Sequence, residues 1–159
     1  PDHQRGGSAR QHERGEPVIG GAVNEDEVRR AVKTITFTGA ANLGAIGAVP
    51  LFTVTGQVVL EKIVAECTVT LGGATATLAL GFTGATAALI AATTATTIAA
   101  GTAWTSSTIG TIPIQIPALM KEWMVNANII GTVAVAAITS GAIRFTAYYR
   151  PASADGLVA

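Results

Sequence analysis

Residues 129–151, IIGTVAVAAITSGAIRFTAYYRP, decide the fold class of this chain. Two apolar runs flank the short polar sequence Thr139-Ser140-Gly141. The second run alternates between an apolar and a polar set: Ile143, Phe145, Ala147 and Tyr149 against Arg144, Thr146, Tyr148 and Arg150. Successive side chains of a strand point to opposite faces, so this alternation predicts a strand with one buried and one solvated face. The Gly-containing turn predicts that the two runs pair as a β-hairpin.

The composition also favours β-structure, and it indicates that the protein assembles with other subunits. The 159 residues have no formal net charge, and only 13% of them are charged, against a usual share of roughly 25%. Eighteen glycines, together with abundant Ala, Val, Ile and Thr, are typical of β-structure with tight turns. A monomer with so few charges has little protection against association. We therefore expect part of the surface to be covered by other subunits.

Period-two alternation and turn residues mark further strands along the chain. We expect strands over residues 34–38, 49–54, 57–71, 75–82, 88–92, 111–117 and 123–125. The prolines of 111–117 (TIPIQIP) lack a backbone donor, so that strand should lie at a sheet edge. About eight strands with regular turns predict an all-β chain, an antiparallel β-sandwich. A jelly roll is the preferred version, by analogy with virion proteins.

The run 57–71 is the longest predicted strand. At about 3.3 Å per residue it would span roughly 50 Å, so we expect a bulge or bend to divide it. On a regular strand Glu61 and Glu66 would fall on opposite faces, whereas Lys62 and Glu66 would share one. The Gly72-Gly73 pair that follows predicts a second hairpin, which returns the chain through 75–82.

The first 33 residues differ from the rest. They hold six of the ten basic and six of the ten acidic residues. We divide the chain into a polar N-terminal arm (1–33) and a sandwich domain (34–159). Residues 1–17 show no hydrophobic periodicity, and we expect them to be disordered unless a partner orders them. Asn24 followed by Glu27 resembles a helix N-cap, which predicts a short helix near 25–32.

No set of residues predicts catalysis. Phosphate-binding, nucleophile-elbow and zinc motifs are absent from the sequence. His3 and His12 lie in the arm without clustered ligands, and Cys67 falls in an apolar run that favours a buried thiol. We expect no enzyme activity, no metal site and no cofactor. The neutral net charge also argues against nucleic acid as a direct partner.

The sequence predicts neither a signal peptide nor a membrane-spanning helix. The N-terminus lacks the apolar core of a signal peptide. The most apolar window, 125–143, contains Asn126, Asn128 and a polar turn, which favours strand-turn-strand over a spanning helix of about 20 residues. We expect no membrane partner.

Two stretches resemble a family of small virion proteins of tailed bacteriophages. SGAIRFTAYYRPASADGLVA (140–159) is similar to their C-terminal alternating strand, Tyr-Arg-Pro and small-residue tail. LFTVTGQVVLEKIVAECTVTLGGATATLALG (51–81) is similar to their long strand and Thr-rich return. The resemblance covers about 49–159 and excludes the arm.

The resemblance implies a structural part of the phage particle, best a head decoration (cement) protein on the outer capsid surface. Such proteins commonly form homotrimers that bind the major capsid protein. The arm arginines Arg5, Arg10, Arg14, Arg29 and Arg30 are then the expected capsid contacts. The expected subunit contacts are Arg144, Tyr148, Arg150, Ile112 and Ile114.

Two alternatives stay open. The chain could be a tail or fibre component, which would be present in far fewer copies per particle. It could instead be a sugar-binding module that stacks carbohydrate on Trp104, Trp123 or Tyr148. Exposure of these aromatic rings separates the sugar-binding reading from a structural one.

Overall fold

The computed structural model describes residues 27–105, 109–112 and 122–159. Over these residues the chain is all-β, with one short 3₁₀ turn, η1 (Ala95–Thr97). The strands are β1 (Arg29–Thr36), β2 (Gly47–Phe52), β3 (Val54–Thr55), β4 (Val58–Gly72), β5 (Thr77–Phe82), β6 (Ala85–Thr94), β7 (Thr102–Trp104), β8 (Gly110–Thr111), β9 (Trp123–Val125), β10 (Ile129–Ala134), β11 (Ser140–Pro151) and β12 (Leu157–Val158).

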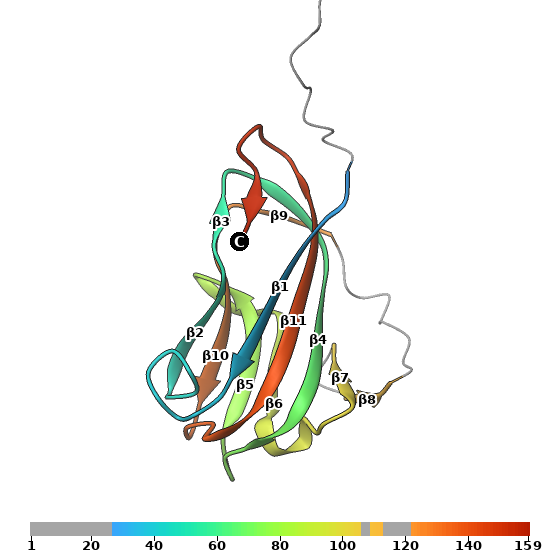
Figure 1. Cartoon of the computed structure of the whole chain (residues 1–159). Coiled ribbons are helices and arrows are strands. Elements are labelled where there is room, and N and C mark those ends of the chain that lie inside the picture. The colour runs from blue at the N-terminus through green and yellow to red at the C-terminus, as the bar shows by residue number, and fades with distance from the viewer. Residues whose placement is uncertain (1–26, 106–108, 113–121) are drawn as a thin grey trace, which may run out of the picture.

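The strands form an antiparallel β-sandwich, as predicted (Figure 1). One sheet has the order β1-β11-β4-β7-β8, with β9 paired to the other end of β4. The second sheet has the order β2-β10-β5-β6, and β3 and β12 make a small separate pair. One hydrophobic core joins the inner faces of the two sheets, with Phe145 and Ile63 from the first and Leu80 and Ile129 from the second.

The pairing of the main strands is nested. β1 pairs with β11, β2 with β10, β4 with β7, and β5 with β6. Each pair therefore encloses the next along the chain. Among these eight paired strands, each one and the next along the chain lie in different sheets, except at the central β5–β6 hairpin.

Both predicted hairpins, at 139–141 and at Gly72-Gly73, are wrong. β10 and β11 each form where the 129–151 pattern indicated extended chain, but they lie in different sheets. β4 and β5, on either side of Gly72-Gly73, are also in different sheets. In each place the connection arches over the end of the core, so the two apolar faces meet across the sandwich. A turn sequence alone does not distinguish an arch from a hairpin.

The predicted helix near 25–32 is wrong over the described residues. Arg29 to Thr36 form β1, which pairs with β11 along its whole length; Arg30 lies opposite Tyr148 and Ile35 opposite Ile143. An isolated helix this short is marginal, whereas the sheet supplies a partner for each residue. The division at 33/34 is wrong for the same reason, because the sandwich already includes Arg29.

Bulges explain why the long runs break strict alternation. In β4, Tyr148 lies opposite Lys62 and Tyr149 opposite Leu60, so Glu61 is the extra residue. This confirms the predicted irregularity in the run 57–71. In β2, Ile130 lies opposite Pro50 and Ile129 opposite Phe52, so Leu51 is extra, and Leu51 and Phe52 are both buried.

The loop after β10 contains a backbone conformation that is rare for its residue type. Val135 has φ +69°, and the Ala136 N–H donates to the Ala134 carbonyl at 2.8 Å. This is a γ-turn of the less common hand, centred on a β-branched residue that is 69% exposed. Farther along the loop, the Ile138 N–H donates to the Gly44 carbonyl and ties it to the β1–β2 connection.

Candidate functional site

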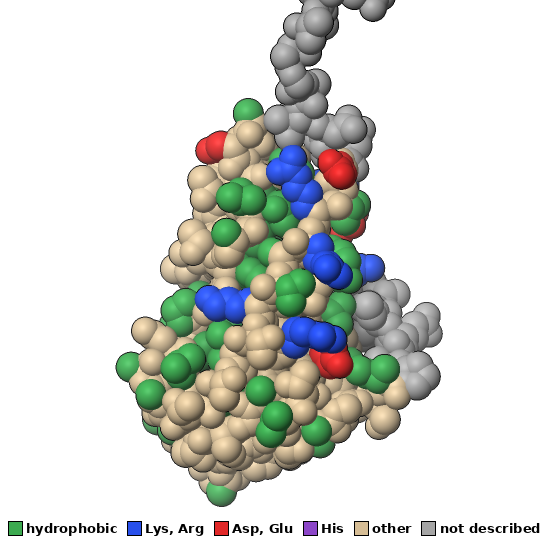
Figure 2. Space-filling view, viewed as in Figure 1, with side chains coloured by type: hydrophobic (Ala, Val, Ile, Leu, Met, Phe, Trp, Pro, Cys, Tyr) green, Lys and Arg blue, Asp and Glu red, His purple; other side chains and the backbone are tan. Residues whose placement is uncertain are grey.

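The outer face of β1, β11 and β4 carries most of the charge of the described residues (Figure 2). We call it the charged face: Arg30, Glu61, Lys62, Glu66, Arg144, Tyr148 and Arg150. The alternation of β11 places its three members on one side, as predicted, because Phe145, Ala147 and Tyr149 take the buried side. The structure thus brings together Arg144, Tyr148 and Arg150 from the predicted subunit contact.

Most cations of the charged face already have partners in the same chain. Arg150 Nε donates to Glu61 Oε1 at 2.7 Å, and its Nη2 lies 3.4 Å from Glu122 Oε1. Arg144 pairs with Glu66. Lys62 Nζ lies 4.8 Å from the centroid of the Tyr148 ring, within the range of a cation–π contact. The face is therefore a network of internal pairs.

The bulge in β4 builds part of this network. Leu60 and Ile63 are both buried, and the two residues between them, Glu61 and Lys62, both lie on the outer side. Glu66 lies on the same side. The prediction that Glu61 and Glu66 lie on opposite faces is wrong. The sequence does contain a sign of the bulge. The apolar residues fall at even positions in Val58 and Leu60, and at odd positions in Ile63, Ala65 and Cys67.

The other predicted contact residues are not part of this group. Ile112 is 48% exposed and directly follows β8, at the far edge of the same sheet. Ile114 and the arm residues Arg5, Arg10 and Arg14 lie outside the described residues. Arg29 and Arg30 are residues of β1, so their placement in an arm is wrong.

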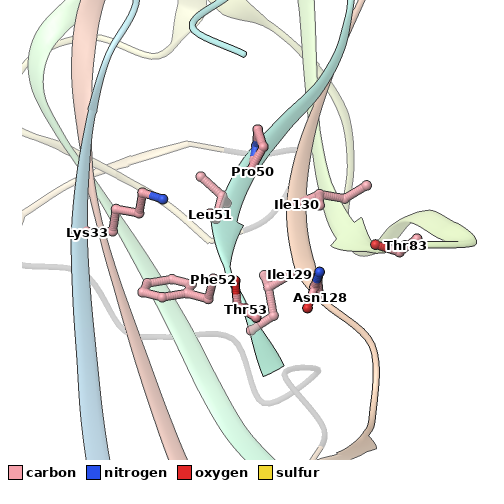
Figure 3. Close-up of a pocket in the computed structure, with 9 residues that line it drawn as sticks. All are labelled: Lys33, Pro50, Leu51, Phe52, Thr53, Thr83, Asn128, Ile129 and Ile130. Carbon is pink, nitrogen blue, oxygen red and sulfur yellow. The ribbon is translucent and has the colours of Figure 1, made fainter. Parts of the chain in front are cut away.

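A hollow of about 250 Å³ opens beside the edge strands β1 and β2 (Figure 3). Lys33 extends from β1 toward β2, and Asn128, Ile129 and Ile130 lie beyond the β2 strand. The Asn128 Oδ1 accepts the Val54 N–H at 3.0 Å. The other polar side chains that line the hollow are those of Lys33, Thr53 and Thr83.

The second sheet presents an outer surface of different chemistry. Its four strands, β2, β10, β5 and β6, contain no charged residue. Ala48 is exposed on β2, and Thr86, Ala87 and Ala91 are exposed on β6. We call this outer surface the uncharged face. Small side chains on a sheet leave its surface open to close approach by another protein.

The two tryptophans have different environments. Trp104 is fully buried, and its indole N–H donates to Thr93 Oγ1 at 3.1 Å, so it is not available to stack on a sugar. Trp123 is 39% exposed and packs against Phe82 with ring centroids 5.5 Å apart. A hollow of about 240 Å³ lies beside Trp123 and Met124.

Cys67 is a buried core residue, as predicted. Its thiol donates toward the Val69 carbonyl at 3.2 Å and the Ile98 carbonyl at 3.4 Å. Burial raises the pKa of this thiol above its ordinary value, so it stays protonated and is a poor nucleophile near neutral pH.

Among the described residues, no three His, Cys, Asp or Glu side chains gather as a metal site would require. In the same part of the chain, no helix has the length and apolar character needed to cross a bilayer. Comparison with protein-family models, with curated proteins and with solved structures found no match.

Proposed function

We propose that the chain is a non-enzymatic structural protein of a bacteriophage particle, and specifically a head decoration protein that binds the major capsid protein on the outer surface. The observation that carries this proposal is the uncharged face. Four strands without a charged residue form an outer surface that would favour association in water. Contact with a capsid surface would cover it.

The resemblance of residues 49–159 to small tailed-phage virion proteins supplies the class of particle. The nested strand pairing supports a jelly-roll assignment, since the four pairs match one long hairpin folded over into two sheets. Jelly rolls recur among viral capsid domains, although a fold alone does not fix a function. The resemblance also implies a homotrimer.

The assignment changes the expected roles of the basic residues. Arg29 and Arg30 belong to the edge of the sandwich, so the attachment segment that we propose is shorter and consists of residues 1–26. Those residues hold three arginines and five acidic residues. Such mixed charge suits salt-sensitive contacts with a capsid surface.

The test is attachment to phage heads that lack the chain. Purified full-length protein is mixed with such heads, and bound copies are counted by quantitative mass spectrometry after sedimentation. We expect hundreds of copies per particle, located on the head by electron microscopy. A few copies located on the tail would replace this proposal with the tail or fibre alternative.

A charge placed on the uncharged face tests the observation itself. Ala48 is exposed on β2, and Ala48→Glu should lower the number of bound copies at least tenfold. Val69→Glu is the matched control, because Val69 is exposed on β4 of the other sheet and should bind normally. Equal attachment of the two variants would exclude the uncharged face as the capsid contact.

Of the two tryptophans, Trp123 is the one that can still serve the sugar-binding alternative. Its partial exposure beside the hollow at Met124 is the geometry that ring stacking would need. Glycan-array binding that disappears in Trp123→Ala would favour this function. Absence of binding by the full chain would leave the structural proposal as the one to pursue.

A further inference from the structure

β1 forms a free edge of its sheet. It pairs with β11 over eight residues without a register shift, and no strand of the described residues pairs with its other side. The other edges are less regular: β2 contains Pro50 and a bulge, β6 shifts register twice against β5, and β8 has two residues. A long regular edge presents unpaired N–H and C=O groups, a template for another strand.

The hydrogen-bond pattern identifies which backbone groups of β1 are unpaired. The Phe37 N–H donates to the Gly141 carbonyl at 2.8 Å, one step beyond the last pair of the register, Thr36 opposite Ala142. Directly opposed residues of an antiparallel pair alternate between bonded and non-bonded positions. The odd residues of β1 therefore bond to β11, and the even residues from Arg30 to Thr36 turn their N–H and C=O groups to the free side.

Three cations lie on this strand without an ion-pair partner among the described residues: Arg29, Arg30 and Lys33. By contrast, Arg144 and Arg150 of the neighbouring strand β11 are paired with glutamates. The side chains of Arg30 and Lys33 are exposed. Unneutralised positive charge therefore gathers on the strand whose backbone is also unpaired, and it favours an occupant of negative charge.

The same edge borders the hollow between β1 and β2. Lys33 extends from β1 toward β2 (Figure 3), and Leu51, Phe52 and Ile129 contribute apolar side chains to the lining. A strand added to β1 would direct alternate side chains toward the sheet that contains β2, and so over this hollow. The inner side of β1 includes Ala31, which packs against the core, so an apolar side chain opposite Ala31 would cover the hollow.

We propose that β1 accepts an extended acidic segment of another protein as an added antiparallel strand. Acidic side chains opposite Arg30 and Lys33 would share their faces and pair with them. A polypeptide strand is the occupant that also satisfies the alternating N–H and C=O groups of the edge. The β1 strand of a second copy would bring three further cations, so like charges disfavour it. This contact does not depend on the proposed function.

Lys33 makes the edge selective. A charge that points inward from an edge strand is a device against unwanted pairing, and a neutral strand would cover this ammonium without giving it a partner, which is costly. An acidic residue opposite Lys33 removes that cost. The edge should therefore reject neutral strands and accept acidic ones, because specificity rests on the penalty for the wrong occupant as much as on attraction to the right one.

The probe for this site is the capped peptide Val-Thr-Glu-Val-Ile-Glu-Glu. In antiparallel register on the full chain, it sets Glu opposite Lys33, Arg30 and Arg29, and Ile opposite Ala31. A control peptide has Gln in place of every Glu. We expect the control to bind roughly tenfold more weakly, because it forms no ion pair with the edge. Chemical-shift titration by NMR, up to about 1 mM peptide, measures both affinities.

Amide hydrogen exchange tests the backbone pairing directly. The N–H groups of Arg30, Val32 and Thr34 face the free side, so bound peptide should slow their exchange in proportion to the bound fraction, about twofold when half of the chains carry peptide. The N–H groups of Lys33 and Ile35 already bond to β11 and should exchange as before. NMR resolves these residues one by one, so the alternation itself is the expected result.

Two charge reversals separate a contact at the edge from long-range attraction. Arg30→Glu should weaken binding of the acidic peptide roughly tenfold, because it opposes like charges. Lys62→Glu is the matched control, since it changes the net charge equally. Arg30 lies opposite Tyr148 and Tyr148 opposite Lys62, so the control position is two strands away from the free side. It should bind the peptide like the wild-type chain.

Val32→Pro tests the edge without a change of charge. It removes an N–H from the free side but no bond to β11, a position at which an edge strand tolerates proline. The variant should lose most of its peptide binding. Amides of β11 that keep their wild-type exchange rates would show that the variant is folded.

Each measurement has a result that would overturn the proposal. Unchanged exchange at Arg30, Val32 and Thr34 in the presence of the acidic peptide would do so, as would equal binding of the acidic and Gln peptides. Equal weakening by Arg30→Glu and Lys62→Glu would reduce the effect to long-range attraction. Normal binding by the folded Val32→Pro chain would exclude backbone pairing at this edge.

Discussion

The indole N–H of Trp104 donates to Thr93 Oγ1 at 3.1 Å, which joins β7 of one sheet to β6 of the other. Both residues are buried, and the Thr93 hydroxyl in turn donates to the Ala91 carbonyl at 3.0 Å. The two sheets are thus connected at this edge by a polar link inside the apolar core. A buried donor such as this indole is costly to leave without a partner.

Thr93→Val should destabilise the domain. The substitution keeps the shape of the side chain but leaves the Trp104 N–H unpaired, which costs about 1–3 kcal/mol of the free energy of unfolding. Urea unfolding followed by tryptophan fluorescence measures the change. Thr94→Val, at an exposed neighbouring position, should have little effect, and an equal loss in both variants would mean that the hydrogen bond is unimportant.

Gly44→Ala should be more damaging than Gly84→Ala. Both glycines have positive φ, +117° and +91°, and an alanine in the left-handed region costs about 1–2 kcal/mol. A Cβ at Gly44 would in addition overlap the Ile138 carbonyl oxygen, whereas nothing lies within 4 Å of a Cβ at Gly84. We expect a further loss of at least about 1–3 kcal/mol at Gly44, measured by chemical unfolding. Indistinguishable midpoints would contradict this packing.

Glu61→Gln should cost more stability than Glu66→Gln. The Glu61–Arg150 pair is the less exposed, with 26% and 30% of the side chains accessible, against 35% and 51% for Glu66–Arg144. Exposed pairs contribute about 0–1 kcal/mol, so we expect Glu61 near the top of this range and Glu66 near zero. Thermal unfolding at low and high salt measures both. A larger effect at Glu66, or no salt dependence at Glu61, would argue against this ranking.

Cys67 should make stability fall with rising pH. Burial raises the pKa of its thiol, so above the unfolded value of about 8.5 the unfolded chain loses this proton before the folded chain does. The folded state then binds more protons, and the free energy of unfolding falls by up to about 1.4 kcal/mol per pH unit until the folded pKa is passed. Cys67→Ala should remove this part of the slope between pH 8 and 10, measured by urea unfolding. Parallel pH profiles of the two proteins would contradict it.

The sequence predicted the local state of most strands better than their partners. The alternation from Ile143 to Arg150 gave both the strand and its buried face, and Cys67 was correctly expected in the core. The turn residues at Gly72-Gly73 and Gly141 did not reveal the sheet crossings, because an arch and a hairpin use similar turn chemistry. The capping pattern from Asn24 to Glu27 predicted a helix, but the edge of β11 made a strand more favourable.

Part of the charged face could be predicted and part could not. Arg144, Tyr148 and Arg150 follow from period two alone. The position of Glu61 depends on a one-residue bulge, which reverses the faces of the residues that follow it up to the next register shift. The hollow at Lys33 needs β1 beside β2, a relationship between two strands that no local pattern contains.

The nested pairing sets the order in which strands can find their partners. β5 and β6 are neighbours in sequence, whereas β1 pairs with β11, which begins more than a hundred residues later. Closing longer loops costs more entropy, and such non-local topologies fold slowly. During synthesis on the ribosome, β1 emerges well before β11 and has no partner strand until β11 follows. Its unpaired edge is open to neighbouring nascent chains throughout that interval, so premature pairing between chains is a hazard built into this topology.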